Sequence, residues 1–422
     1  MSSTQTWYEG EELDDLSSVE ELRAPPPVQN TREDQTPHLE DISRQESGQR
    51  SRSIGNRRQV NTAGLDELTA PAPSHHSQLV VLSYLIFFSL LGTLARLGVQ
   101  WLTFYPGAPV VTPVLWANVG GSFFMGFLSE DRRMFQHPSF SRNNAPKPDM
   151  SAEEQKAHHV KVKKTIPLYI GLATGFCGSF TSFSSFMRDA FLALSNDLTS
   201  PYSHPIPRHN GYSVLAVLAV LLYEPALSLA ALFVGAHAAL LFDTFTPSIP
   251  YTITRHILDP AIVILAFGSW IAVVLVAVFP PDKSWRGEAL LALIFAPPGC
   301  LARFYASVKL NPLVPSFPTG TFAVNVFGST VLAVAFVLQR VSGVAGLEAC
   351  MALQGLQDGF CGCLTTVSTW VAELQGLRRR HAYIYGVASV GAALAIMVVI
   401  MGSVKWGVGW VSPVCATGRT SS

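Results

Sequence analysis

The stretch Gly171-Leu-Ala-Thr-Gly-Phe-Cys-Gly-Ser-Phe-Thr-Ser-Phe-Ser184 decides the fold, because its pattern returns later in the chain. The later copy is Gly355-Leu-Gln-Asp-Gly-Phe-Cys-Gly-Cys-Leu-Thr-Thr-Val-Ser368, displaced by 184 residues. Both copies lie in apolar segments, where each glycine costs a helix about 1 kcal/mol relative to alanine. We interpret them as helices that break in the middle. Close helix packing through small residues is the alternative.

Two further motifs recur in the same order, each displaced by 207 residues. Gly92-Thr-Leu-Ala-Arg96 returns as Gly299-Cys-Leu-Ala-Arg303. Asn118-Val-Gly-Gly-Ser122 returns as Asn325-Val-Phe-Gly-Ser329. Three motifs in one order identify an internal repeat.

Composition places this repeat in a membrane. Charged residues make up 14% of the chain, against about 25% in a soluble domain, and mean hydropathy is +0.30. Residues 1–77 hold 14 acidic and 7 basic residues, so the body is poor in charge. This excludes a soluble enzyme, a nucleic-acid binder and a secreted disulfide scaffold. A helix needs about 20 apolar residues to span a bilayer, which predicts spans at 79–101, 111–128, 165–187, 219–241, 257–279, 288–308, 319–338, 350–372 and 382–404.

The span count determines the topology. Four spans fall in each copy, and the unmatched span 257–279 between them inverts the second copy, as in many transport proteins. The basic loops 129–165 and 373–381 place the N-terminus in the cytosol and the C-terminus outside the cell. The predicted fold is an all-α membrane protein with two inverted four-helix repeats and broken third helices. The predicted regions are a disordered tail 1–77, repeats at 78–243 and 287–406, a linker 244–286 and a C-terminal tail 407–422.

The six cysteines carry no metal-site pattern, since no histidine lies at ligand spacing. We expect them to be small buried residues. The pair Cys361 and Cys363 alone is weak evidence for metal or redox chemistry.

Polar residues inside the spans are candidates for function, because they are costly in a bilayer. Arg96 and Arg303 either reach an interface or attract an anion and bond between helices. Asn118 and Asn325 either bond between helices or donate amide N–H groups to a small anion. Unwound backbone at membrane depth needs a partner, so two facing breaks would form a four-carbonyl cation site.

Two phenylalanines follow the first break. Phe183 and Phe186 lie three residues apart on one helix face. They are either core residues or rings whose electropositive edges face an anion.

Taken together, these motifs over residues 79–404 resemble those of the bacterial fluoride channels and the eukaryotic fluoride exporters. The resemblance implies a passive, selective fluoride channel of the plasma membrane that gives fluoride resistance. It also implies a central structural Na⁺ held by backbone carbonyls of Gly178, Thr181, Gly362 and Thr365. The expected partners are fluoride and the lipid bilayer, without nucleic acid, and the expected unit is a monomer. The pore-lining residues assigned on this basis are Asn118, Asn325, Phe183, Phe186, Trp370, Val367, Ser184, Ser368, Tyr385 and Ser389.

The second copy departs from the family's pattern. Val367 and Trp370 stand at the phenylalanine positions. Because each family pore draws one ring from each half, we expect the Phe183–Trp370 pore to conduct and the Phe186–Val367 pore to be degenerate. The fourth spans differ as well, since Glu224 aligns with Tyr385 and a carboxylate is unfavourable in an anion path.

A proton-coupled carrier for another small solute remains the alternative, with Asp358, Glu224 or Glu373 as its proton site. An intramembrane enzyme is not expected. The chain has no GxSxG or HExxH motif, and His237 and His381 are isolated.

Overall fold

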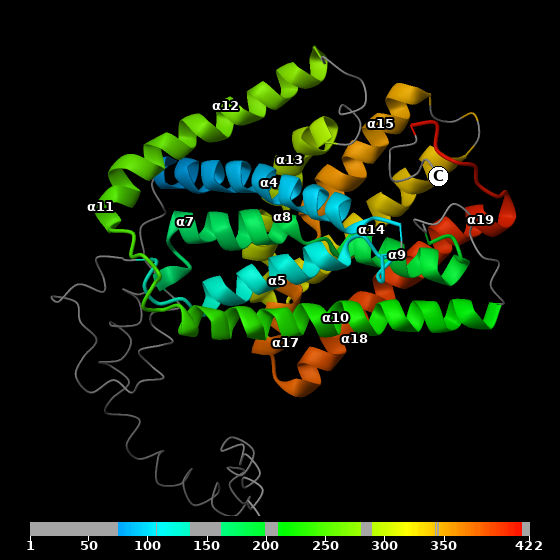
Figure 1. Ribbon diagram of the computed structural model, residues 1–422, viewed down its shortest axis with the longest axis horizontal. Coiled ribbons are helices and arrows are strands. Elements are labelled where there is room, and N and C mark those ends of the chain that lie inside the picture. Colours follow the sequence, from blue (N-terminus) through cyan, green and yellow to red (C-terminus); the bar gives the residue numbers. More distant parts are fainter. Residues whose placement is uncertain are drawn as a thin grey trace, which may run out of the picture. The chain divides into compact units, whose positions relative to one another are not determined.

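The computed structural model describes residues 75–106, 108–135, 162–198, 210–279, 289–341, 343 and 346–415. Their secondary structure is helical, without a strand in these ranges (Figure 1). The predicted tail 1–77 lies outside the described residues except for the start of the first helix. The all-helical fold class is therefore confirmed for the part of the chain that can be compared.

The described parts of the first copy and the linker are helical. Their elements are α4 (His75–Thr103), α5 (Leu115–Glu130), α7 (Pro167–Ile170), η3 (Gly171–Cys177), α8 (Gly178–Phe180), α9 (Phe183–Ser195), α10 (Asn210–Leu241), α11 (Tyr251–Ile253), η4 (Thr254–Leu258) and α12 (Asp259–Val278). The second copy consists of α13 (Leu291–Leu310), η6 (Asn311–Leu313), α14 (Thr319–Arg340), α15 (Leu347–Gly355), η7 (Leu356–Cys361), α16 (Gly362–Leu364), α17 (Ser368–Gly376), α18 (Arg379–Met397), η8 (Val398–Gly402) and α19 (Ser403–Gly407).

Among the residues that the structure describes, six stretches of helix are long and apolar enough to cross a membrane: Gln78–Thr103, Gly211–Leu241, Tyr251–Val278, Leu291–Leu313, Thr319–Arg340 and Arg379–Gly407. Each overlaps one of the nine predicted spans. The other three predictions fall on α5, which has only 16 residues, and on the two interrupted helices. A break divides a spanning segment into pieces that are each too short to count alone.

Both third helices break at the predicted place. Thr181 has φ −95° and ψ 155°, and Thr365 has φ −95° and ψ 152°. These extended residues follow the π-helical turns η3 and η7, in which the backbone bonds reach one residue further than in an α-helix. The two copies therefore share backbone geometry as well as sequence.

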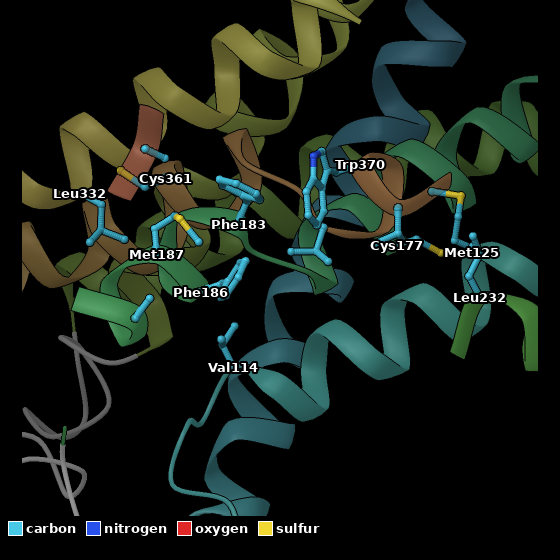
Figure 2. Close-up of a cluster of buried hydrophobic side chains, with 14 of the residues drawn as sticks. Val114, Met125, Cys177, Phe183, Phe186, Met187, Leu232, Leu332, Cys361 and Trp370 are labelled. Carbon is cyan, nitrogen blue, oxygen red and sulfur yellow. The ribbon is translucent and has the colours of Figure 1, made fainter. Parts of the chain in front are cut away.

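The part of each broken helix after the break packs against the other copy. The segment α9 lies on α14 and α18, and α17 lies on α5 and α10. Figure 1 shows α10 running alongside α5. The buried apolar core surrounds this crossing and includes Phe183, Phe186 and Trp370 (Figure 2).

Two glycines bring α5 and α10 into backbone contact. A Cβ atom on Gly126 would overlap the carbonyl of Leu232, and one on Gly235 would overlap the carbonyl of Phe123. Asn118 of α5 bonds to Glu224 of α10, and Gly126 meets Leu232 eight residues further along both helices. The two helices therefore run in the same direction. This register also positions Ser122 and Asn118, which lie one and two helical turns before Gly126 on α5.

The prediction of small buried cysteines missed a bond between two of the six, although Cys350 is buried as expected and Cys415 is half-buried. Cys350 and Cys415 form a disulfide with a Cα–Cα distance of 5.7 Å. The chain after α19 returns to the second copy, where Val411 N–H donates to the Arg340 carbonyl at 2.9 Å and the ring of Trp410 lies against Phe336. The remaining cysteines, which lie in the helices, are free and buried as expected.

Candidate functional site

The threonine at each break caps the helix that follows the break in the other copy. Thr181 Oγ1 accepts the N–H groups of Val367 and Ser368, both at 3.2 Å, where α17 begins. Thr365 Oγ1 accepts the N–H of Ser184 at 3.0 Å, near the start of α9. The first amide groups of a helix have no intrahelical partner, so each copy supplies a partner to the other.

A cluster of buried hydroxyls surrounds this exchange. The Ser184 hydroxyl lies 3.0 Å from Thr365 Oγ1 and donates to the Cys361 carbonyl at 3.4 Å. Reciprocally, the Ser368 hydroxyl lies 3.1 Å from Thr181 Oγ1 and donates to the Cys177 carbonyl at 3.1 Å. The hydroxyl-bearing residues are fully buried, so the crossing is polar inside an apolar body.

The two asparagines lie directly at the breaks. Asn118 Oδ1 accepts the N–H of Ser182 at 2.8 Å, and Asn325 Oδ1 accepts the N–H of Thr366 at 2.9 Å. Their amide nitrogens differ. Asn118 donates to Glu224 Oε2 at 3.1 Å, whereas Asn325 donates to the Thr366 carbonyl at 3.3 Å. The structure thus brings the asparagines together with the broken helices.

These bonds also redirect amides away from backbone carbonyls of the first copy. In a continuous helix, Ser182 N–H would donate to the carbonyl of Gly178, but it donates to Asn118 instead. Ser185 N–H would donate to the carbonyl of Thr181, but it donates to Ser182 Oγ at 3.3 Å. Both carbonyls therefore lose their helical donors.

The second copy repeats this redirection at the matched positions. Thr366 N–H donates to Asn325 rather than to the carbonyl of Gly362. Thr369 N–H donates to Thr366 Oγ1 at 3.4 Å rather than to the carbonyl of Thr365. The freed carbonyls of the two copies are the four that the resemblance assigns to sodium. Sequence reasoning did not single out Ser182 and Thr366, although each directly follows the threonine of its motif.

The two arginines crosslink the copies through backbone carbonyls. Arg303 donates to the Thr174 carbonyl at 2.7 Å and to the Cys363 carbonyl at 2.8 Å. Arg96 donates to the Asp358 carbonyl. Thr174 and Asp358 occupy matched positions in η3 and η7. Both arginines are buried, so neither side chain reaches an interface with water.

The arginines also explain two motif glycines. A Cβ atom on Gly178 would overlap the guanidinium of Arg303, and one on Gly362 would overlap that of Arg96. Glycine is therefore needed where each arginine crosses the broken helix of the other copy.

Aromatic rings meet beside the crossing, as Figure 2 shows. Phe183 contacts Trp370 edge-on at 5.3 Å between ring centroids, and Phe186 at 5.7 Å. Val367 is buried in the same apolar cluster. The pair Phe183–Trp370 joins the two copies, whereas Phe183–Phe186 lies within α9.

The fourth helices differ between the copies. Tyr385 donates its hydroxyl to Glu373 Oε2 at 2.7 Å, and Ser389 donates to the Tyr385 carbonyl. Thr321 and Asn311 donate to Glu373 Oε1 at 2.7 and 3.2 Å. Sequence reasoning missed Thr321 and Asn311, because no spacing relates them to Glu373. In the first copy, Glu224 Oε1 is buried and has no hydrogen-bond partner among the described residues.

Paired broken helices with polar residues buried at the breaks are typical of α-helical membrane transport proteins. The chain belongs to the family described as CrcB-like protein, Camphor Resistance (CrcB), whose model matches residues 83–236 and 290–403. The unmatched interval contains α12, the predicted linker span.

Several relatives have names that state a function. Fluoride export protein 1 of Neurospora crassa is 53% identical over 354 residues, covering 78% of this chain and 67% of that protein. Fluoride export protein 1 of Candida albicans is 34% identical over 337 residues, covering 78% and 81%. The fluoride-specific ion channel FluC of Chromobacterium violaceum is 32% identical over 126 residues, covering 29% of this chain and 95% of the channel. No solved structure matches the chain significantly.

Proposed function

We propose that this protein is a passive, selective fluoride channel that exports fluoride from the cytosol across the plasma membrane. The observation that carries the proposal is the polar crossing of the two broken helices, with Asn118 and Asn325 bound to it from either side. The names of the relatives supply the ion. A small, hard anion needs hydrogen-bond donors in place of its water, and amides, hydroxyls and ring edges provide them.

The architecture that supports this function is a pair of inverted four-helix repeats with nine spans, active as a monomer. The bacterial relative aligns along nearly its whole length with less than a third of this chain, as expected for one copy of two. The matched exchange of caps at Thr181 and Thr365 agrees with a pseudo-two-fold axis through the crossing.

The orientation places the N-terminus in the cytosol and the C-terminus outside. The disulfide Cys350–Cys415 supports this direction. Disulfides persist in oxidising surroundings and are rare in the cytosol, and the predicted topology puts both cysteines on the outer side.

A structural Na⁺ fits the crossing. The carbonyls of Gly178, Thr181, Gly362 and Thr365 have lost their helical donors, and carbonyl oxygens are suitable ligands for a hard cation. The ion would join the copies and compensate the freed carbonyls. In this proposal the chain's residues perform transport, and the ion holds the breaks in place.

The conducting path runs past the Phe183–Trp370 pair, and the path past Phe186 and Val367 is degenerate. The ring contact between the copies and the carboxylate of Glu224 at the position of Tyr385 support two unequal paths.

The test is fluoride efflux from liposomes that contain the purified protein, read with a fluoride electrode. We expect fluoride to leave rapidly down its gradient while chloride stays. Accumulation of fluoride or another solute driven by an imposed pH gradient would favour the carrier. No fluoride flux through folded protein would refute the channel.

A further inference from the structure

One polar cluster is left unexplained by the proposed fluoride path. It consists of the side chains of Glu224, Ser122 and Ser228, between α5 and α10. Glu224 Oε1 and both serine hydroxyls are buried, and no described residue forms a hydrogen bond with them. Glu224 is 1% exposed, and each serine is 0% exposed. Buried polar atoms in proteins are normally paired, so this cluster indicates a missing ligand.

The helix register brings the three side chains together. Asn118 bonds to Glu224 across the α5–α10 contact. One helical turn further along, Ser122 lies on the same face as Asn118, and Ser228 lies on the same face as Glu224. Since the two helices run in the same direction, the serines face each other one turn beyond the carboxylate.

Apolar and backbone contacts enclose the cluster along the helices. One further turn on, Gly126 leaves room only for the carbonyl of Leu232. One turn before it, Val114 and Val220 are buried.

The second copy provides an internal comparison. Ser329 and Ser389 occupy the positions of Ser122 and Ser228 in the repeat. Ser329 donates to the Asn325 carbonyl and Ser389 to the Tyr385 carbonyl, each at 2.7 Å. Such a bond to the carbonyl four residues earlier is an ordinary arrangement for serine in a helix. Neither serine of the first copy forms such a bond among the described residues, although Ser122 follows Asn118 at the spacing by which Ser329 follows Asn325.

Charge decides which ligand is expected. Glu224 receives one donor, from Asn118, and forms no ion pair within the described part of the chain. On the neighbouring helix α9, Arg188 and Asp189 pair with each other at 2.9 Å. The carboxylate of Glu224 repels an anion, and together with the two hydroxyl oxygens it offers the hard oxygen ligands that suit a small cation.

We propose that Glu224, Ser122 and Ser228 form a binding site for a sodium ion inside the first copy, separate from the carbonyls of the breaks. The site compensates the buried carboxylate of Glu224. It makes this layer of the first copy a cation site rather than part of a fluoride path.

Equilibrium dialysis of the purified full-length protein with ²²Na⁺ tests the proposal. The protein is held in potassium-free, choline-based buffer, and bound sodium is counted per chain. We expect Glu224→Gln to bind one sodium ion fewer than the wild type. The double variant Ser122→Ala/Ser228→Ala should lose the same ion or bind it at least tenfold more weakly. The matched double variant Ser329→Ala/Ser389→Ala should retain it.

The readout separates this site from the sodium proposed at the breaks, because only the difference between variants reports on Glu224. A central site that failed to bind sodium would lower every count equally. Equal sodium binding by the wild type and both first-copy variants would overturn the proposal, and would leave a proton as the occupant. Fluoride bound by the wild type and lost in Glu224→Gln would overturn it in favour of an anion site. If Glu224→Gln does not fold, the two serine variants decide the question.

Discussion

Substitution of Thr365 by valine should separate the capping role of its hydroxyl from its packing role. Valine has nearly the same shape, so the substitution leaves no cavity. The Thr365 hydroxyl accepts Ser184 N–H at 3.0 Å and donates to the Cys361 carbonyl at 2.9 Å. The carbonyl keeps another donor, Thr365 N–H, and the Ser184 hydroxyl keeps the Cys361 carbonyl. The main loss is therefore the partner of one buried amide.

The magnitude follows from that single unpaired group. Leaving a buried donor unsatisfied costs about 1–3 kcal/mol, and removing a helix cap costs about 0.5–2 kcal/mol. These describe the same bond, so the free energy of unfolding should fall by about 2 kcal/mol, with no water at this depth to replace the hydroxyl. A change of this size shifts the unfolding equilibrium about thirtyfold.

The assay is reversible unfolding in mixed micelles, followed by tryptophan fluorescence. Thr330→Val is the matched control, because Thr330 donates to the carbonyl of Val326 within its own helix and accepts no described amide. We expect this control to lose less than about 1 kcal/mol. If Thr365→Val is as stable as Thr330→Val, the exchange of caps does not hold the two copies together and the reasoning fails.

Three further predictions use the same preparations. Phe183→Ala should abolish fluoride efflux while Phe186→Ala retains it, and equal loss in both would contradict the assignment of the conducting path. Arg303→Met should be at least about 2 kcal/mol less stable than the wild type, because the Thr174 and Cys363 carbonyls lose a charged donor; stability equal to wild type would show that the crosslink contributes nothing. Lys163→Met should destabilise the protein by a comparable amount, because the ammonium donates to the carbonyls of Leu128, Ser129 and Asp131 at the end of α5, and an unchanged unfolding midpoint would refute this role.

The broken helices were predictable because glycine and threonine change the backbone locally. The paired motif placed the interruptions correctly at Thr181 and Thr365. Helix length identifies six of the nine predicted spans in the described part of the chain, because an interrupted helix is divided into pieces that are each too short. The sequence pattern therefore predicted those features that depend on the backbone preferences of neighbouring residues.

The partners of the buried side chains were not predictable, because they depend on how distant helices cross. Sequence reasoning left Arg303 open between attracting an anion and bonding between helices, and its bonds to Thr174 and Cys363 fall in the second class. The disulfide gave no signal, since Cys350 and Cys415 lie 65 residues apart in dissimilar segments. The assignment of pore residues and of sodium ligands stays a prediction.

The exchange of caps at the crossing has a consequence for synthesis of the chain. Thr365 follows Ser184 by 181 residues. At roughly 5–20 residues per second, the ribosome makes this threonine about 10–40 s after the amide that it caps. During that interval the start of α9 has an unpaired amide in the nascent first half. The first half therefore cannot reach its final form on its own, and a chaperone or insertase that shields the unfinished break would act within this window.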